Sequence, residues 1–273
     1  IRDSICLMHG MEVDYYKKLF QTIGNIIELI EKDDMPKYLL FLENAFPYMD
    51  NYNYHKGMKG IIQELKCLLK TKSIGTDSDQ ALLLDFQAAL ETKPEKAIKL
   101  EKDALAQIEN ITADNARLVS NLHANLGGLY RMNGHPDLAR EHMEKSISLL
   151  DQFNLLHIND SIPQIANYAM FLTEQQEPER GISELQKLSG IIKEYHSDDC
   201  LDYAKVQETL GTIYLMTANL PQAKTHFKRA FKIYEKIWAD EPEMIEAKYQ
   251  EIQELYPQIG FCIGKNLSGL LTK

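Results

Sequence analysis

The stretch "NLHANLGGLYRMNGHPDLAREHMEKSISLL", which runs from Asn121 to Leu150, places two adjacent glycines, Gly127 and Gly128, in a pattern that otherwise predicts helix. A glycine in a helix interior costs about 1 kcal/mol relative to alanine. Glycine at such a position usually marks the close approach of a neighbouring helix or of a ligand. The rest of the chain has to distinguish these two explanations.

The sequence repeats with a period of 42 residues. Gly127, Ala169 and Gly211 are one period apart. The register continues through two further columns of residues: Ala139, Gly181 and Ala223, then Met143, Leu185 and Phe227. Self-similarity at a fixed period predicts a repeat architecture.

Each repeat predicts a helical hairpin. The turns "MNGHPD", "EQQEPE" and "TANLPQ" each carry a proline just inside the second helix, where its missing N–H is tolerated. Gly127 and Gly211 then fall where the two helices cross, because a side chain there would push their axes beyond the usual separation of about 8–10 Å. Gly128 lies outside this column.

Two flanking segments follow the period less well. Stepping back 42 residues gives a fainter unit around Leu84, Ala88, Ala97 and Ala104, in which Asp85 occupies the small-residue column. After residue 243 only the helical period survives, which is typical of a terminal capping unit.

The pattern resembles the tetratricopeptide repeat over about residues 78–256. The matching residues are Leu126, Gly127, Tyr130, Gly134, Ala139 and Met143, with Leu210, Gly211, Tyr214, Ala223, Phe227 and Ala230. The period of 42 is similar to the long repeats of kinesin light chains and of the C-terminal sensor regions of bacterial STAND/NB-ARC-type signalling ATPases. The resemblance implies an all-α fold, a right-handed superhelix (solenoid) of antiparallel helical hairpins.

We expect two domains. Residues 1–72 predict degenerate helical hairpins, with helices over 11–34, 35–50 and 55–73, and residues 78–273 predict the repeat array with its capping helices. Residues 73–79, "SIGTDSD", predict the linker. Because the chain begins with Ile1, we expect a fragment of a larger regulatory protein.

Composition argues against two classes of binding partner and indicates a cellular location. A net charge of -10 argues against nucleic-acid and anionic-membrane partners, because both bind basic patches. Four widely spaced cysteines, with no signal peptide and no membrane span, are typical of a cytoplasmic protein.

We find no motif for catalysis or for a cofactor. The sequence has no P-loop, HExxH or GxSxG motif, so we predict that the protein is not an enzyme and binds no cofactor. His142 and His226 share one repeat phase, and we expect them on solvated helix surface rather than at a metal.

The resemblance implies a concave groove lined by the first helices of the repeats. Its predicted contacts are Asn121, Asn125, Gly128 and Arg131 in one unit, Asn167, Met170 and Thr173 in the next, and Lys205, Thr209 and Thr212 in the third. Asparagine offers both a donor and an acceptor to a peptide backbone. Gly128 then gives clearance for the ligand. The alternative is that Asn125 and Asn167 face solvent or bond locally.

Three functions stay open at this point. The first is a protein-interaction or sensor module that binds a peptide or protein segment in the groove. The second is a regulatory region that packs against upstream nucleotide-binding domains of the same chain. The third is the peptide-pheromone-sensing part of a transcriptional regulator.

Overall fold

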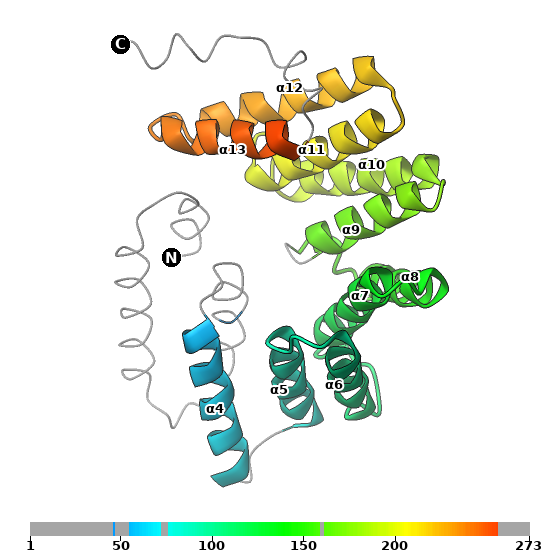
Figure 1. Cartoon of the computed structure of the whole chain (residues 1–273), viewed down its shortest axis with the longest axis vertical. Helices are drawn as coiled ribbons and strands as arrows, with labels where there is room; N and C mark the ends of the chain where they lie inside the picture. The colour runs from blue at the N-terminus through cyan, green and yellow to red at the C-terminus, as the bar shows by residue number, and fades with distance from the viewer. Residues whose placement is uncertain (1–45, 47–54, 72–75, 159–160, 256–273) are drawn as a thin grey trace. The chain divides into compact units, whose positions relative to one another are not determined.

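The computed structural model describes residues 46, 55–71, 76–158 and 161–255, and its regular structure over these residues is helical, without a strand. The helices, shown in Figure 1, are α4 (His55–Thr71), α5 (Asp77–Ala89), α6 (Pro94–Ala106), α7 (Ala116–Met132), α8 (Pro136–Gln152), α9 (Ser161–Glu174), α10 (Pro178–Tyr195), α11 (Leu201–Met216), α12 (Leu220–Ile237) and α13 (Pro242–Leu255). None of these described helices is long and apolar enough to cross a bilayer. The predicted all-α hairpin fold is confirmed.

The chain forms two compact units, which meet in the sequence between Phe153 and Asn154. The N-terminal unit contains α4 and the hairpins α5/α6 and α7/α8, and the C-terminal unit contains the hairpins α9/α10 and α11/α12 followed by α13. The predicted domain boundary between residues 72 and 78 stays a prediction. The helices predicted over 11–34 and 35–50 lie outside the described residues apart from Phe46, and the segment after residue 255 lies outside them too.

The start of α5 corrects the predicted linker. Residues 77–79 form the first turn of the helix rather than part of a connection. Thr76 caps this turn, because its hydroxyl accepts a hydrogen bond from the Asp79 N–H while the Asp79 carboxylate accepts one from the Thr76 N–H at 2.6 Å. This reciprocal arrangement satisfies two backbone donors that a helix start otherwise leaves unpaired.

The three repeat turns have one backbone geometry. Gly134, Gln176 and Ala218 stand 42 residues apart, and all three have positive φ, at 72°, 66° and 58°. The residue that follows each of them donates its N–H five residues back, as from Glu177 to the Leu172 carbonyl at 2.8 Å. This left-handed C-cap ends each first helix and turns the chain into the second.

The hairpin crossings confirm the predicted role of the glycine column. A Cβ added to Gly127 would lie 2.6 Å from Cγ of Met143, and one added to Gly211 would lie 2.9 Å from Cδ2 of Phe227. In the middle hairpin the glycine is on the opposite helix: a Cβ on Gly181 would lie 2.6 Å from the Ala169 carbonyl oxygen. The glycine is thus on the first helix of α7/α8 and α11/α12 and on the second helix of α9/α10, and alanine occupies the corresponding column of the other helix, at Ala139, Ala223 and Ala169.

Helix α13 packs onto α12 and extends the stack of the C-terminal unit. The Tyr249 ring lies against Phe231, with ring centroids 4.1 Å apart. The Lys248 ammonium lies 3.0 Å from Glu208 Oε1, and the buried Tyr234 hydroxyl donates to Glu208 Oε2 at 2.6 Å. A polar bond network thus joins α11, α12 and α13.

Candidate functional site

The hairpin α5/α6 carries carboxyl groups where the other hairpins carry apolar contacts. Asp85 is one period before Gly127, and Glu101 is one period before Met143. Glu101 is only 2% exposed, and Asp85 is half-buried. An acidic pair therefore replaces the small–large apolar pair at this crossing.

Asn125 on α7 binds both carboxyl groups. Its amide nitrogen donates to Asp85 Oδ1 at 2.9 Å and to Glu101 Oε1 at 3.3 Å, although the residue is exposed. The bonds fix the orientation of the amide and leave its oxygen, Oδ1, on offer as an acceptor. The local bonding that the sequence left open as an alternative thus holds for the amide nitrogen of Asn125.

Glu101 is neutral at physiological pH. Burial, followed by the negative charge of Asp85, raises the pKa of the Glu101 carboxyl to about 10. A hydrogen bond with the Asp85 side chain also favours the neutral form, and no other described residue donates an N–H to the buried Oε2 atom of Glu101. The Asp85–Glu101–Asn125 cluster therefore consists of the buried, neutral carboxyl group of Glu101, the half-exposed carboxylate of Asp85 and the oriented amide of Asn125.

The predicted contacts of the N-terminal unit lie along α7, and we call Asn121, Asn125, Gly128 and Arg131 the α7 face. A Cβ on Gly128 would meet nothing within 4 Å, so this glycine, unlike Gly127, serves no helix crossing. Asn121 and Arg131 are half-buried. Gly128 leaves open space one turn from the exposed Asn125.

The predicted contacts of the C-terminal unit lie on α9 and α11. Asn167 and Lys205 are exposed, and Met170, Thr209 and Thr212 are half-buried; we call these five residues the α9–α11 face.

Thr173 does not belong to the α9–α11 face. It is only 7% exposed, and its hydroxyl donates to the Ala169 carbonyl of its own helix at 2.9 Å. The expectation that Thr173 faces a ligand is wrong, because its side chain is buried in the hairpin.

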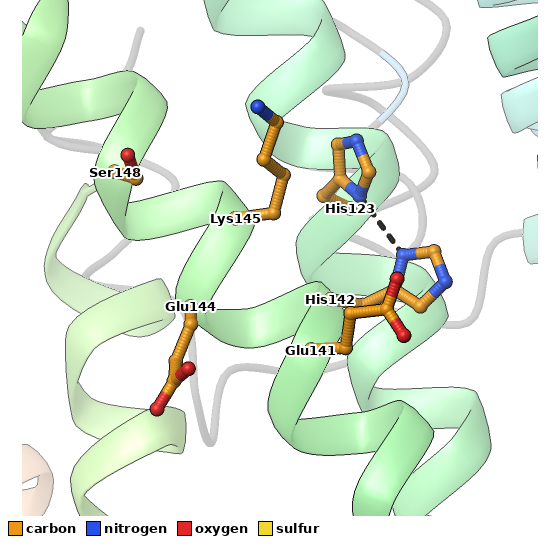
Figure 2. Close-up of a pocket in the computed structure, with 6 residues that line it drawn as sticks. All are labelled: His123, Glu141, His142, Glu144, Lys145 and Ser148. Atoms are coloured by element: carbon orange, nitrogen blue, oxygen red, sulfur yellow. Dashed lines mark hydrogen bonds between the residues drawn. The ribbon is translucent and has the colours of Figure 1, made fainter.

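A surface pocket opens beside the hairpin α7/α8, as Figure 2 shows. It is lined by His123, Glu141, His142, Glu144, Lys145 and Ser148. His123 and His142 point toward one another, with their Nδ1 atoms 2.9 Å apart (Figure 2). One Nδ1 must carry the proton that the other accepts.

The same contact recurs two periods later. His226 Nδ1 lies 2.9 Å from Gln207 Oε1 and the His226 ring stacks on Tyr214, as the His142 ring stacks on Tyr130. Burial lowers the pKa of His142 and of His226. Both histidines are half-buried, so the prediction that they lie on solvated surface is wrong. Within the described residues no three His, Cys, Asp or Glu side chains are grouped to hold a metal.

A comparison with protein families finds a match within the C-terminal unit. Residues 161–236 match the tetratricopeptide repeat family. This span holds the hairpins α9/α10 and α11/α12. A comparison with curated proteins finds no match.

Solved structures of tetratricopeptide repeat solenoids share the fold over a longer span. BtubC (BKLC) from P. vanneervenii is similar with a TM-score of 0.58 and 18% identity, over 75% of this chain and 82% of that one. A Podosopora anserina protein of kinesin light chain type, with nearly identical TPR-like repeats, has a TM-score of 0.54 and 13% identity, over 74% of this chain and 97% of that one. The predicted likeness to long, kinesin light chain-like repeats is confirmed for the fold.

Sequence reasoning missed two arrangements that the 42-residue register contains. Asp85 stands out as an irregularity in its column, but the column of Met143, which holds its partner Glu101, does not by itself indicate a pair. His123 precedes His142 by the same 19 residues that separate Gln207 from His226. Both pairs are found when polar residues, as well as apolar ones, are compared at positions 42 or 84 residues apart.

Proposed function

We propose that this chain binds extended segments of a protein or peptide through two surfaces, the α7 face on the N-terminal unit and the α9–α11 face on the C-terminal unit. Tetratricopeptide repeats act in protein–protein interaction. Both faces lie on first helices of their hairpins, and helical solenoids present their first helices to the partner on extended concave surfaces.

Asn125 is the observation that carries this proposal. The residue is exposed, yet Asp85 and Glu101 hold its amide nitrogen, so the amide oxygen is oriented before a partner arrives. An oriented acceptor loses less conformational entropy on binding than a mobile one. A backbone N–H of an extended segment is a suitable donor, and Gly128 leaves room for that backbone.

Asn167 is the second amide, on a separate unit. It is exposed on α9 and can offer both its donor and its acceptor. Each net hydrogen bond contributes about 0.5–1.5 kcal/mol, and 1.4 kcal/mol is tenfold in affinity. Removing both amides should therefore weaken binding by about 5- to 100-fold.

The experiment starts from a partner captured by this chain from a lysate and mapped to its bound segment. The affinity of that segment is then measured for the wild type, for Asn125→Ala, for Asn167→Ala and for the double variant. Lys228→Ala is the control, because Lys228 is exposed on the second helix α12. Melting temperatures report the fold of every variant.

We expect the double variant to lose affinity while Lys228→Ala binds as the wild type does. Unchanged affinity in a folded double variant would place the binding surface elsewhere and end this proposal. A loss in only one of the two single variants would assign the segment to one unit.

A further inference from the structure

We propose that the Asp85–Glu101–Asn125 cluster recognises a lysine or arginine side chain of the bound segment. This inference rests on the function proposed above and specifies the chemistry of the partner at the α7 face.

The packing of the cluster is the first argument. At the equivalent positions the other hairpins hold Gly127 against Met143, and Gly211 against Phe227. Carboxyl groups at such a crossing destabilise the hairpin relative to an apolar pair, because they lose hydration without gaining equivalent contacts. Positions that break the local rules of a fold are those where a functional role is expected.

The buried carboxyl group of Glu101 is the second argument. Oε2 is buried on a residue that is only 2% exposed, and no other described residue donates an N–H to it. When Glu101 is neutral, its carboxyl proton is shared with Asp85 through the hydrogen bond that also raises the pKa of Glu101. A bound ammonium or guanidinium group can replace that proton as the donor to the two carboxyl groups. Lysine carries three N–H donors and arginine five.

The groups around that oxygen suit a cation. Asp85 from α5 supplies a half-exposed carboxylate, and Asn125 from α7 supplies the amide oxygen next to it. A basic side chain can contact both while it displaces the amide nitrogen from Glu101. The net charge of -10 also attracts a basic segment over longer distance.

The protonation state of Glu101 provides a specific readout. Asp85 is the charged group that acts on the Glu101 carboxyl, and burial together with that charge raises its pKa to about 10. A cation bound beside the two carboxyl groups favours the ionised form of Glu101. Binding of a basic side chain should then release a proton from Glu101 to the buffer, up to one per complex.

The probe is a positional-scanning library of acetylated and amidated dodecapeptides, with one central position fixed as Lys, Arg, Gln or Glu. We expect the Lys or Arg sets to bind the full chain about 5- to 10-fold better than the Gln set, with Glu weakest. Titration calorimetry of the strongest Lys or Arg peptide in two buffers of different ionisation enthalpy counts the protons released.

Two isosteric variants test the assignment. Asp85→Asn should bind Lys, Arg and Gln peptides alike, because the charge is gone. Glu101→Gln should keep the fold and the preference for a basic residue, but release no proton. Melting curves and the affinity of the Gln peptide show that each variant is folded.

Equal binding of the Lys, Arg and Gln sets by the wild type would overturn the inference, as would a full basic preference in Asp85→Asn or the absence of proton release. If the lysate-derived segment depends on Asn125 and Asn167 but not on Asp85, this inference fails while the proposed function stands.

Discussion

Four glycines with three kinds of surroundings predict three different responses to alanine. A Cβ at Gly128 or at Gly190 meets nothing within 4 Å, whereas at Gly127 it meets the flexible side chain of Met143. At Gly181 it meets backbone: the Ala169 carbonyl oxygen at 2.6 Å and the Ala169 Cα at 3.2 Å. The prediction is that the stability of these variants follows what the new methyl group touches.

The magnitudes follow from two opposing effects. Alanine in place of glycine stabilises a helix interior by about 0.8–1 kcal/mol, and Gly128→Ala and Gly190→Ala should show this gain. Ordinary contact begins at 3.4 Å, so Gly181→Ala is about 0.8 Å too close to a backbone atom. Overpacking costs about 1–3 kcal/mol, which makes the net change for Gly181→Ala about 0–2 kcal/mol destabilising. Gly127→Ala should lie between, because Met143 can move.

Urea unfolding at equilibrium measures the series. The decisive comparison is Gly181→Ala with Gly190→Ala, because both residues are in α10 and the helix-propensity gain cancels. We expect Gly181→Ala to be less stable by about 1–3 kcal/mol, with unchanged urea dependence. Equal free energies of unfolding for these two variants would show that α9 and α10 do not cross at Gly181.

Three further predictions concern the turns, the histidine pair and the capping helix. Ala218→Gly should raise the free energy of unfolding by about 0.5–1 kcal/mol in urea melts, because alanine is strained at positive φ, and Gly134→Ala should lower it by a similar amount. Burial, then His142 and then Lys145, lower the pKa of His123 to about 4, so its neutral form is favoured in the folded state. Stability should therefore decline as the pH falls from about 6.5 toward 4; His123→Gln, which copies Gln207, should flatten that decline, and an unchanged slope would count against the assignment. Tyr234→Phe removes the donor to Glu208 and should destabilise the chain by about 1.5–3 kcal/mol in thermal or chemical melts, while Tyr195→Phe, on an exposed ring, should change little.

The sequence was a good guide to the hairpins because their contacts are periodic. Gly127 and Gly211 predicted the helix crossings, and the prolines predicted the starts of α8, α10 and α12. The left-handed turns at Gln176 and Ala218 were not predicted, since neither residue type signals positive φ. Gly134 was the one member of that set with a visible signal.

The side-chain contacts of the candidate site were harder to predict. The register placed Asn125 on the surface of a first helix, but its bonds to Asp85 and Glu101 depend on packing between helices about 40 and 24 residues away in the sequence. Thr173 has a polar side chain and was expected at the surface, yet its hydroxyl bonds to its own helix and allows burial. Composition alone does not distinguish these two outcomes.

The position of glycine at each crossing determines which parts of this protein can be recombined. Pairing α9, which carries Ala169, with α8, which carries Ala139, would set two methyl groups against each other. Pairing α7, with Gly127, with α10, with Gly181, would leave a void at the contact. Exchanging a single helix with the middle hairpin therefore breaks the glycine–alanine pair, whereas exchanging or duplicating a whole hairpin keeps it.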